Sequence, residues 1–329
     1  MLNKLMMFTI MIMMMMGCSS IKLNKINIIQ LDYQKHQSII SILNDDLSLN
    51  NKITLNNKVL MNYSSSIINE KKSFISLNTT NKFTNELLSY DKTTNKTDVI
   101  SLSDENPSIF SKFNNKIYYT SNFINGQNKL LSYDLTTKKT EIIIIKKLLI
   151  EKMISDNNYL YLISTALVNN ESTFIKMDKN NKIIKTIILK QPLTSNSQPL
   201  ISNNKIYLFT HSNNNNHYLN IIDDNLNIID HIQYPDQYPY QMIMNNKQLI
   251  ISNTEILNHE PIKPLLYLYQ NHQFKPIKLA ENIYDMKLVN QKLYLLGESV
   301  LYLYDYDNLK KINQYKLPAN LISSSLLLD

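Results

Sequence analysis

The sequence predicts an all-β protein built from a repeated four-stranded sheet. The first observation is a short pattern that recurs along the chain: two polar residues, then lysine or tyrosine, then an alternating apolar strand. Five copies begin at residues 114, 157, 203, 245 and 290, and a weaker copy begins at residue 70. The second observation is that the chain after its N-terminal apolar run has no convincing helical spacing of apolar residues. The third is a hydrophobic content of 43%, which is typical of a folded globular chain.

Each repeat contains four strand patterns in about 44 residues. In the repeat around residue 114, a strand over 108–113 precedes the strand over 116–121. A third strand ends at Asp134, and a fourth covers 140–145. Four short antiparallel strands repeated every 40–50 residues are typical of a β-propeller blade. Radial packing of blades covers both faces of each sheet, and closure of the ring protects the sheet edges, so we expect a β-propeller.

The number of repeats predicts seven blades over residues 26–329. Six repeats begin between about residues 60 and 318, which leaves one fragment at 26–43 and another at 320–329. The two fragments together can form one blade, with the C-terminal strand innermost and the N-terminal strands outside it. Six blades with an N-terminal extension is the alternative, and eight blades would need more residues than the chain offers.

The unusual composition of the chain predicts which residues form its turns. The chain has only three glycines, no arginine, and 46 asparagines among its 329 residues. Asparagine tolerates positive φ and bonds to its own backbone in turns. We therefore expect asparagine in the hairpins where propellers usually carry glycine.

The N-terminus predicts export and lipid attachment. A charged start and an apolar run over residues 5–16 precede Gly17 and Cys18, and this run is too short to span a bilayer. It resembles the bacterial lipoprotein signal peptide, whose lipobox ends in Gly-Cys. The resemblance implies a signal peptide over 1–17, cleavage before Cys18, two acyl chains on the Cys18 thiol, and a tether over 18–25. An unmodified thiol in an ordinary signal peptide is the alternative.

The residue after the cysteine bears on location. It is Ser19 rather than aspartate, which in diderm lipoproteins resembles the signal for the outer membrane facing the periplasm. In a cell with one membrane, the anchor would lie in the outer leaflet. Cys18 is also the only cysteine, so the mature chain has no internal disulfide.

The repeats themselves carry a second resemblance. Residues 116–121 (KIYYTS) and 131–138 (LSYDLTTK) resemble propeller repeats of the TolB or WD40-like periplasmic kind. The layout is also similar to BamB, the lipid-anchored propeller of outer-membrane protein assembly. These resemblances imply a protein-binding or scaffolding module of the cell envelope, with another envelope protein or an extended peptide as its partner.

Several chemistries are excluded by what the sequence lacks. Clustered glycines are absent, so no phosphate-binding loop can form, and without arginine there is no guanidinium clamp of the kind that sialidases use. Tryptophan, which surrounds the quinone of quinoprotein dehydrogenases, is absent too, as is a G-x-S-x-G elbow. We expect no enzyme activity, no cofactor and no metal. The alternative is a metal-dependent hydrolase or lyase, or a small-ligand sensor, with acidic and amide residues in the central channel.

Neither the distribution of charge nor the spacing of histidines predicts a nucleic-acid or metal site. The net charge is +7, but the lysines are spread without a long run, so we expect a solvated surface and no nucleic-acid partner. Four of the six histidines fall between His211 and His259. We expect them to be exposed loop residues rather than metal ligands.

Two loops are the best candidates for partner binding. Residues 234–240 (YPDQYPY) join two blades, and residues 254–264 join the second and third strands of the next blade, so both loops should emerge on one face. Tyrosine and proline give a rigid amphipathic contact area. The candidate residues are Tyr234, Asp236, Tyr238, Tyr240, His259 and Glu260. The alternative is that the prolines only stiffen two long loops.

Overall fold

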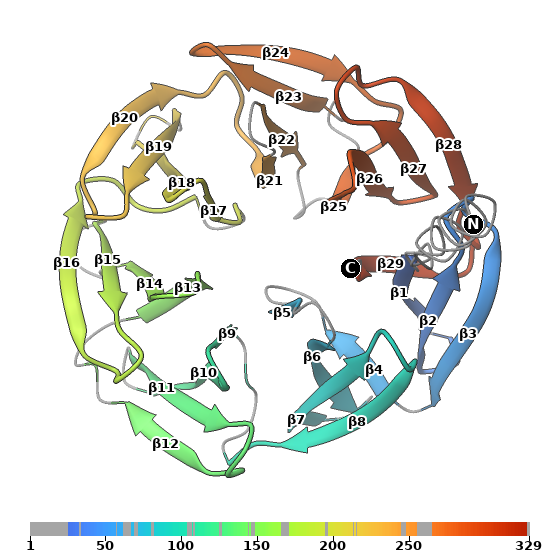
Figure 1. The fold of residues 1–329 in the computed structure, drawn as a ribbon, viewed down its shortest axis with the longest axis horizontal. Helices are drawn as coiled ribbons and strands as arrows, with labels where there is room; N and C mark the ends of the chain where they lie inside the picture. The colour runs from blue at the N-terminus through green and yellow to red at the C-terminus, as the bar shows by residue number, and fades with distance from the viewer. Residues whose placement is uncertain are drawn as a thin grey trace, which may run out of the picture.

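The computed structural model is a closed ring of seven four-stranded antiparallel sheets (Figure 1). It describes residues 26–32, 34–56, 58–61, 67–68, 72–79, 82–103, 107, 109–124, 127–143, 145, 149–165, 171–194, 197–212, 214, 216–244, 248–254 and 265–327. These residues contain no helix, and so none that could cross a membrane. The prediction of an all-β propeller with seven blades is confirmed.

Each blade is a sheet whose strands run in order from the centre of the ring outward. Blade 1 contains β29 (Ile322–Leu327), β1 (Ile26–Asp32), β2 (Gln37–Leu43) and β3 (Leu49–Asn56). Blade 2 contains β4 (Lys58–Met61) with β5 (Ile67–Ile68), β6 (Lys72–Thr79), β7 (Lys82–Asp91) and β8 (Lys96–Ser101). Blade 3 contains β9 (Phe110–Phe113), β10 (Lys116–Ile124), β11 (Gln127–Asp134) and β12 (Thr140–Ile143). Blade 4 contains β13 (Leu149–Ser155), β14 (Leu160–Thr165), β15 (Ser172–Met177) and β16 (Ile183–Leu189).

The remaining three blades follow the same order. Blade 5 contains β17 (Leu200–Ser202), β18 (Lys205–His211), β19 (His217–Asp223) and β20 (Ile228–Gln233). Blade 6 contains β21 (Pro239–Met244), β22 (Leu249–Asn253), β23 (Leu265–Gln270) and β24 (Gln273–Lys278). Blade 7 contains β25 (Ile283–Val289), β26 (Lys292–Gly297), β27 (Val300–Asp305) and β28 (Lys311–Lys316).

The two ends of the chain close the ring inside blade 1, as the two sequence fragments predicted. Strand β29 is innermost and pairs antiparallel with β1, so that Asn27 lies opposite Leu327. The fourth strand of this blade, β3, has a mostly exposed and polar sequence that gave no apolar alternation to detect. The innermost strand of blade 2 is also divided, because β4 and β5 both pair with β6.

The core is divided into seven apolar clusters, one between each pair of neighbouring blades. The cluster between blades 7 and 1 shows that the ring is closed, since Ile26 and Leu43 pack with Tyr294 and Leu303 and all four are buried. Burial of apolar area at every blade interface is the main stabilising term in a chain that has no disulfide.

Asparagine takes the strained turn positions, as the composition predicted. Fourteen described residues other than glycine have positive φ, and seven of them are asparagine. Asn114 (φ 52°), Asn203 (52°) and Asn290 (49°) lie between the first and second strands of their blades. Asparagine visits the left-handed region at a lower cost than most residues with a Cβ, so these hairpins form without glycine.

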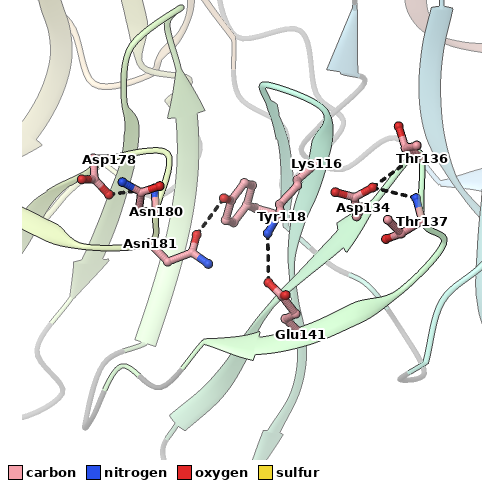
Figure 2. A network of polar contacts seen from close by, with 9 residues as sticks. All are labelled: Lys116, Tyr118, Asp134, Thr136, Thr137, Glu141, Asp178, Asn180 and Asn181. Carbon is pink, nitrogen blue, oxygen red and sulfur yellow. Dashed lines mark hydrogen bonds and ion pairs between the residues drawn. The ribbon is translucent and has the colours of Figure 1, made fainter.

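An aspartate at the end of the third strand holds the next turn in several blades (Figure 2). The backbone N–H groups of Thr136 and Thr137 donate to Asp134 Oδ1 at 2.9 and 2.8 Å. These bonds lower the pKa of Asp134 because they favour its charged form. Neighbouring blades are also joined by polar bonds, since the Tyr118 hydroxyl donates to Asn181 Oδ1 at 2.7 Å. The recurring acid in the sequence is therefore a turn cap.

Candidate functional site

The antiparallel strands give the ring two different faces. Loops between blades, and loops between the second and third strands of a blade, lie on one face, which we call the loop face. The tight turns after the first and third strands lie on the opposite face, which we call the turn face. The loop between β20 and β21 belongs to the loop face, and the end of β22 and the start of β23 lie on the same face. His259 and Glu260, with residues 255–264 as a whole, lie outside the described residues, as do Gly17 and Cys18.

Tyr234 is an internal anchor and does not lie on the surface of its loop. Its side chain is 3% exposed, and its ring makes edge contacts with Phe209, Tyr267 and Phe274 at centroid distances of 5.0, 5.2 and 5.3 Å. The Tyr234 backbone N–H donates to the His217 carbonyl at 2.8 Å. Burial raises the pKa of Tyr234 well above its ordinary value. The ring therefore fixes the start of the loop between blades 5 and 6.

Asp236 and Tyr238 of this loop are half-buried and held by hydrogen bonds. Asp236 Oδ2 accepts a hydrogen bond from the Tyr267 hydroxyl at 3.1 Å. The Tyr238 N–H donates to Asn253 Oδ1 at 3.1 Å, and the Tyr238 carbonyl accepts from the Thr254 N–H at 2.9 Å. The loop between the blades is thus tied to the start of the adjoining loop of blade 6. Pro235 and Gln237 are exposed between these fixed points.

Tyr240 belongs to the innermost strand rather than to the loop. It lies on β21, and its carbonyl accepts a hydrogen bond from the Gln198 N–H at 2.7 Å. Burial raises the pKa of the Tyr240 hydroxyl, and the nearby Asp285 and Tyr284 raise it further. Of the four predicted residues that the structure describes, Asp236 and Tyr238 lie together on the loop face. Tyr234 lies below them, and Tyr240 lies on the strand that follows.

A pair of histidines lies beside this loop. His211 and His217 face each other across the end of the β18–β19 hairpin, with ring centroids 5.8 Å apart. His217 is 9% exposed, and its Nδ1 shares a hydrogen bond of 2.9 Å with the Thr194 hydroxyl. Burial lowers the pKa of His217 to about 4, and the nearby His211 contributes to the shift. The expectation of exposed loop histidines is therefore wrong for His217, because the connection between blades 4 and 5 covers it.

A chain of hydrogen-bonded polar side chains through blade 5 holds the connection between blades 4 and 5. The sequence patterns did not indicate it. The Thr210 hydroxyl donates to Gln191 Oε1 at 2.7 Å and accepts from Asn220 Nδ2 at 2.9 Å. Asn220 Oδ1 and His231 Nδ1 lie 2.8 Å apart, so the hydrogen-bonded chain reaches the outer strand. Backbone bonds from Thr194 to Phe209 and from His211 to Pro192 hold the same connection. Residues 191–194 are therefore held against β18 and His217, and His217 in turn accepts the Tyr234 backbone bond.

A buried carboxylate lies among the innermost strands, which surround the centre of the ring (Figure 1). Asp285 is 5% exposed. Its Oδ1 accepts from Gln241 Nε2 at 2.7 Å and from the Met286 N–H at 2.8 Å, and its Oδ2 accepts from the Leu326 N–H at 2.6 Å. The innermost strands of blades 6, 7 and 1 are joined through this one side chain. Lys287 Nζ also lies 3.6 Å from Oδ1 as an ion pair. Both oxygens therefore have partners, which gives Asp285 a structural role at the closure of the ring.

A search of the described part of the chain finds no three His, Cys, Asp or Glu side chains grouped so that they could hold a metal ion. His211 and His217 form a pair, and Asp285 lies with amide, backbone and lysine donors. The described residues of the loop face offer tyrosine, carboxylate, amide and imidazole groups.

Comparison with known proteins supports the architecture. No protein-family model matches the chain. No curated protein sequence matches it either. A structure of Hsv2 from Kluyveromyces lactis with loop 6CD replaced by a Gly-Ser linker aligns with a TM-score of 0.54 at 11% identity, over 75% of this chain and 78% of that chain. The same protein with its complete loop 6CD gives 0.51 at 10% identity, over 75% and 80% of the two chains.

A third structure, the uncharacterized protein lmo1340 from Listeria monocytogenes EGD-e, aligns with a TM-score of 0.45 at 16% identity, over 61% of this chain and 62% of that chain. At these identities, the Hsv2 comparisons support the fold alone.

Proposed function

We propose that this protein is an exported, lipid-anchored propeller that binds another envelope protein or an extended peptide through the loop face of blades 5 and 6. The observation that carries the proposal is the 234–238 loop, in which Asp236 and Tyr238 are held on the loop face above the buried Tyr234 ring. A role in envelope assembly, similar to that of the TolB and BamB propellers, is part of the proposal.

A fixed loop is well suited to binding because little freedom remains to be lost when a partner arrives. Ordering a side chain or loop at an interface costs about 0.5–1.5 kcal/mol per immobilised side chain. Here the backbone of Tyr238 already bonds on both sides, to Asn253 and to Thr254. Tyrosine supplies a large contact area with a polar end, and Asp236 supplies a charge that favours a lysine, an arginine or a free amide on the partner.

The anchor is the second part of the proposal, and it rests on Gly17 and Cys18. Acylation of the Cys18 thiol and amine would give two or three buried chains, which is enough for stable attachment. The propeller would then sit on the outer membrane facing the periplasm in a diderm cell, or on the outer leaflet of a cell with one membrane. Metabolic labelling with an alkyne palmitate analogue tests this part, since a Cys18→Ser variant should take up no label.

Binding is tested by mild crosslinking in the cells that make the protein, followed by purification and identification of the crosslinked proteins. A Tyr238→Ala variant should lose the partner and keep its fold. Tyr304→Ala is the matched control because Tyr304 is a half-buried tyrosine near the turn-face end of β27. Capture by Tyr238→Ala at the wild-type level would contradict the proposed binding face.

The Tyr234→Ala variant tests the structural role of Tyr234 separately from the binding role of Tyr238. Removal of this buried ring should cost about 3–5 kcal/mol of stability, as is usual for large aromatic side chains in a core. The Tyr238→Ala variant should stay within about 1 kcal/mol of the wild type because its side chain is only half-buried. Urea unfolding of the two variants measures the difference. If Tyr234→Ala is as stable as Tyr238→Ala, the anchoring role of Tyr234 is wrong.

A further inference from the structure

Both ends of the described chain lie on the turn face. Strand β29 follows the loop at residues 317–321, which belongs to the loop face, and it therefore ends on the turn face at Leu327. Strand β1 pairs antiparallel with β29 and begins at Ile26 beside that end. The segment that joins the proposed lipid-bearing Cys18 to the propeller must therefore leave from the turn face.

The length of this tether limits which parts of the propeller can lie against the membrane. Eight Cα-to-Cα steps separate Cys18 from Ile26, and a fully extended chain spans at most about 3.6 Å per residue, so the tether reaches roughly 29 Å. Any arrangement in which the acyl chains lie in the bilayer must keep Ile26 within that reach of the lipid surface.

A route from Ile26 around the outer rim to the loop face is longer than the tether. Strand β1 has two strands outside it in blade 1, β2 and β3, and at a spacing of about 4.8 Å the chain must first travel roughly 10 Å outward. It must then travel the height of the ring, which for the seven residues of β1 is roughly 23 Å at about 3.3 Å per residue. The path of roughly 33 Å exceeds the reach of the tether.

We propose that the turn face rests on the lipid headgroups and that the loop face points away from the membrane, toward the partner. This proposal rests on the proposed lipid attachment at Cys18. The partner of the turn face is a bilayer surface, and the partner of the loop face is then a protein that approaches from the aqueous side. The loop that carries Asp236 and Tyr238 is left open by this arrangement.

The turn face has mixed charge, which makes the tether the main cause of the orientation. Asp134 lies in the same turn as Lys138 and Lys139, and Asp178 lies in the same turn as Lys182. Because the two signs alternate along these turns, attraction to anionic lipid is weak, and salt should not change which face is covered.

The largest group of exposed isoleucines on the rim does not compete for the membrane. Eight large apolar side chains are strongly exposed in the described chain, and all lie on outermost strands. The group of three on β16 is Ile183, Ile184 and Ile188. Blade 4 lies across the ring from blade 1, so this rim is on the far side from the tether (Figure 1). A tether of roughly 29 Å cannot bring that rim to the bilayer.

The test uses the only cysteine of the chain. The mature protein, beginning at Cys18, is coupled to a maleimide lipid in phosphatidylcholine vesicles, and surface lysines are labelled with a bulky water-soluble succinimidyl ester and counted by mass spectrometry. Exposed turn-face lysines (Lys138, Lys179 and Lys310) are compared with exposed loop-face lysines (Lys190, Lys278 and Lys316) before and after coupling.

We expect coupling to reduce labelling of the turn-face lysines and to leave the loop-face lysines unchanged, at low and at high salt. Equal protection of both faces, or protection of the loop face, overturns the proposal. A Cys18→Ser variant that also carries Gln237→Cys attaches through the loop face and should reverse the pattern. A long Gly-Ser insertion after Ser20 should abolish the preference.

Chemical coupling also separates the two proposals. The vesicle experiment does not require the cell to acylate Cys18, whereas palmitate labelling in cells tests that step alone. Absence of palmitate label would contradict the anchor and leave the vesicle result standing. Failure of the vesicle experiment would overturn the orientation and leave the anchor intact.

Discussion

Replacement of Asp285 by asparagine should loosen the closure of the ring. The two carboxylate oxygens accept from donors on opposite sides, with Gln241 Nε2 at 2.7 Å on one side and the Leu326 N–H at 2.6 Å on the other. Asparagine keeps the shape and offers one acceptor oxygen and one NH₂ group. Whichever way it turns, the NH₂ group faces a donor, so at least one buried donor loses its partner.

The cost can be worked out from these contacts. A buried donor left without a partner costs about 1–3 kcal/mol, and hydrogen bonds to a charged group are stronger than neutral ones. Since the donors on β29 and β21 compete for the single remaining oxygen, we expect the free energy of unfolding to fall by about 3 kcal/mol. For a propeller of roughly 300 residues, with an unfolding entropy of about 2.1 cal/mol/K per residue, that corresponds to a fall in Tm of roughly 5 °C.

Urea unfolding measures the loss, and hydrogen exchange locates it. The Leu326 amide should exchange faster in Asp285→Asn than in the wild type, while amides in blades 3 and 4 should not. The control is Asp307→Asn, an exposed aspartate in the outer turn of blade 7, which should change stability by less than about 0.5 kcal/mol. Wild-type stability in Asp285→Asn, or a loss without faster exchange at Leu326, would refute this account of the closure.

Three further predictions concern the turns and the buried polar groups. Tyr118→Phe removes the 2.7 Å bond to Asn181 and should cost about 1 kcal/mol in urea unfolding, and wild-type stability would show that this bond adds nothing. In the folded protein the pKa of His217 is about 4, below its ordinary value of 6.5. Between pH 6.5 and pH 4, the His217 ring is therefore protonated more fully in the unfolded chain than in the folded protein. The stability that His217 supplies is complete above pH 6.5 and is lost as the pH falls toward 4. In unfolding titrations between pH 7 and 4.5, His217→Gln should lack about 1–2 kcal/mol of the pH-dependent change, whereas His231→Gln should keep it, and equal slopes in all three proteins would contradict the assignment. Asn114→Gly should be neutral at φ 52°, whereas Asn114→Val should cost about 1–2 kcal/mol, and calorimetry that shows equal Tm values would remove the conformational role of asparagine.

The repeat predicted the architecture because each blade has its own local pattern. An apolar strand after an asparagine-rich turn marks the second strand of a blade. The structure buries consecutive residues of β10 and β18, because neighbouring blades cover both faces of these strands. The fourth strand of blade 1 was missed because β3 lies at the edge and has little apolar alternation. The division of the inner strand of blade 2 was missed because it is defined by strand pairing. β4 and β5 are separate strands, and each pairs with β6.

The loop was predicted more accurately than the roles of its tyrosines. Tyr234 and Tyr238 look alike in the sequence, but only Tyr234 lies over the rings of Tyr267 and Phe274, which belong to the next blade. Burial of His217 depends in the same way on the connection at residues 191–194. These differences arise from contacts between segments far apart in the chain, and a single sequence without alignment contains no local signal for them.

Photo-crosslinking in growing cells tests the proposed binding face most directly. A photoreactive phenylalanine analogue is placed at Tyr238 on the loop face, at Lys138 on the turn face, or at Ile228 on the outer rim. The account predicts a discrete protein adduct at position 238 that is absent at positions 138 and 228. No adduct at 238, or the same adducts at all three positions, would contradict it.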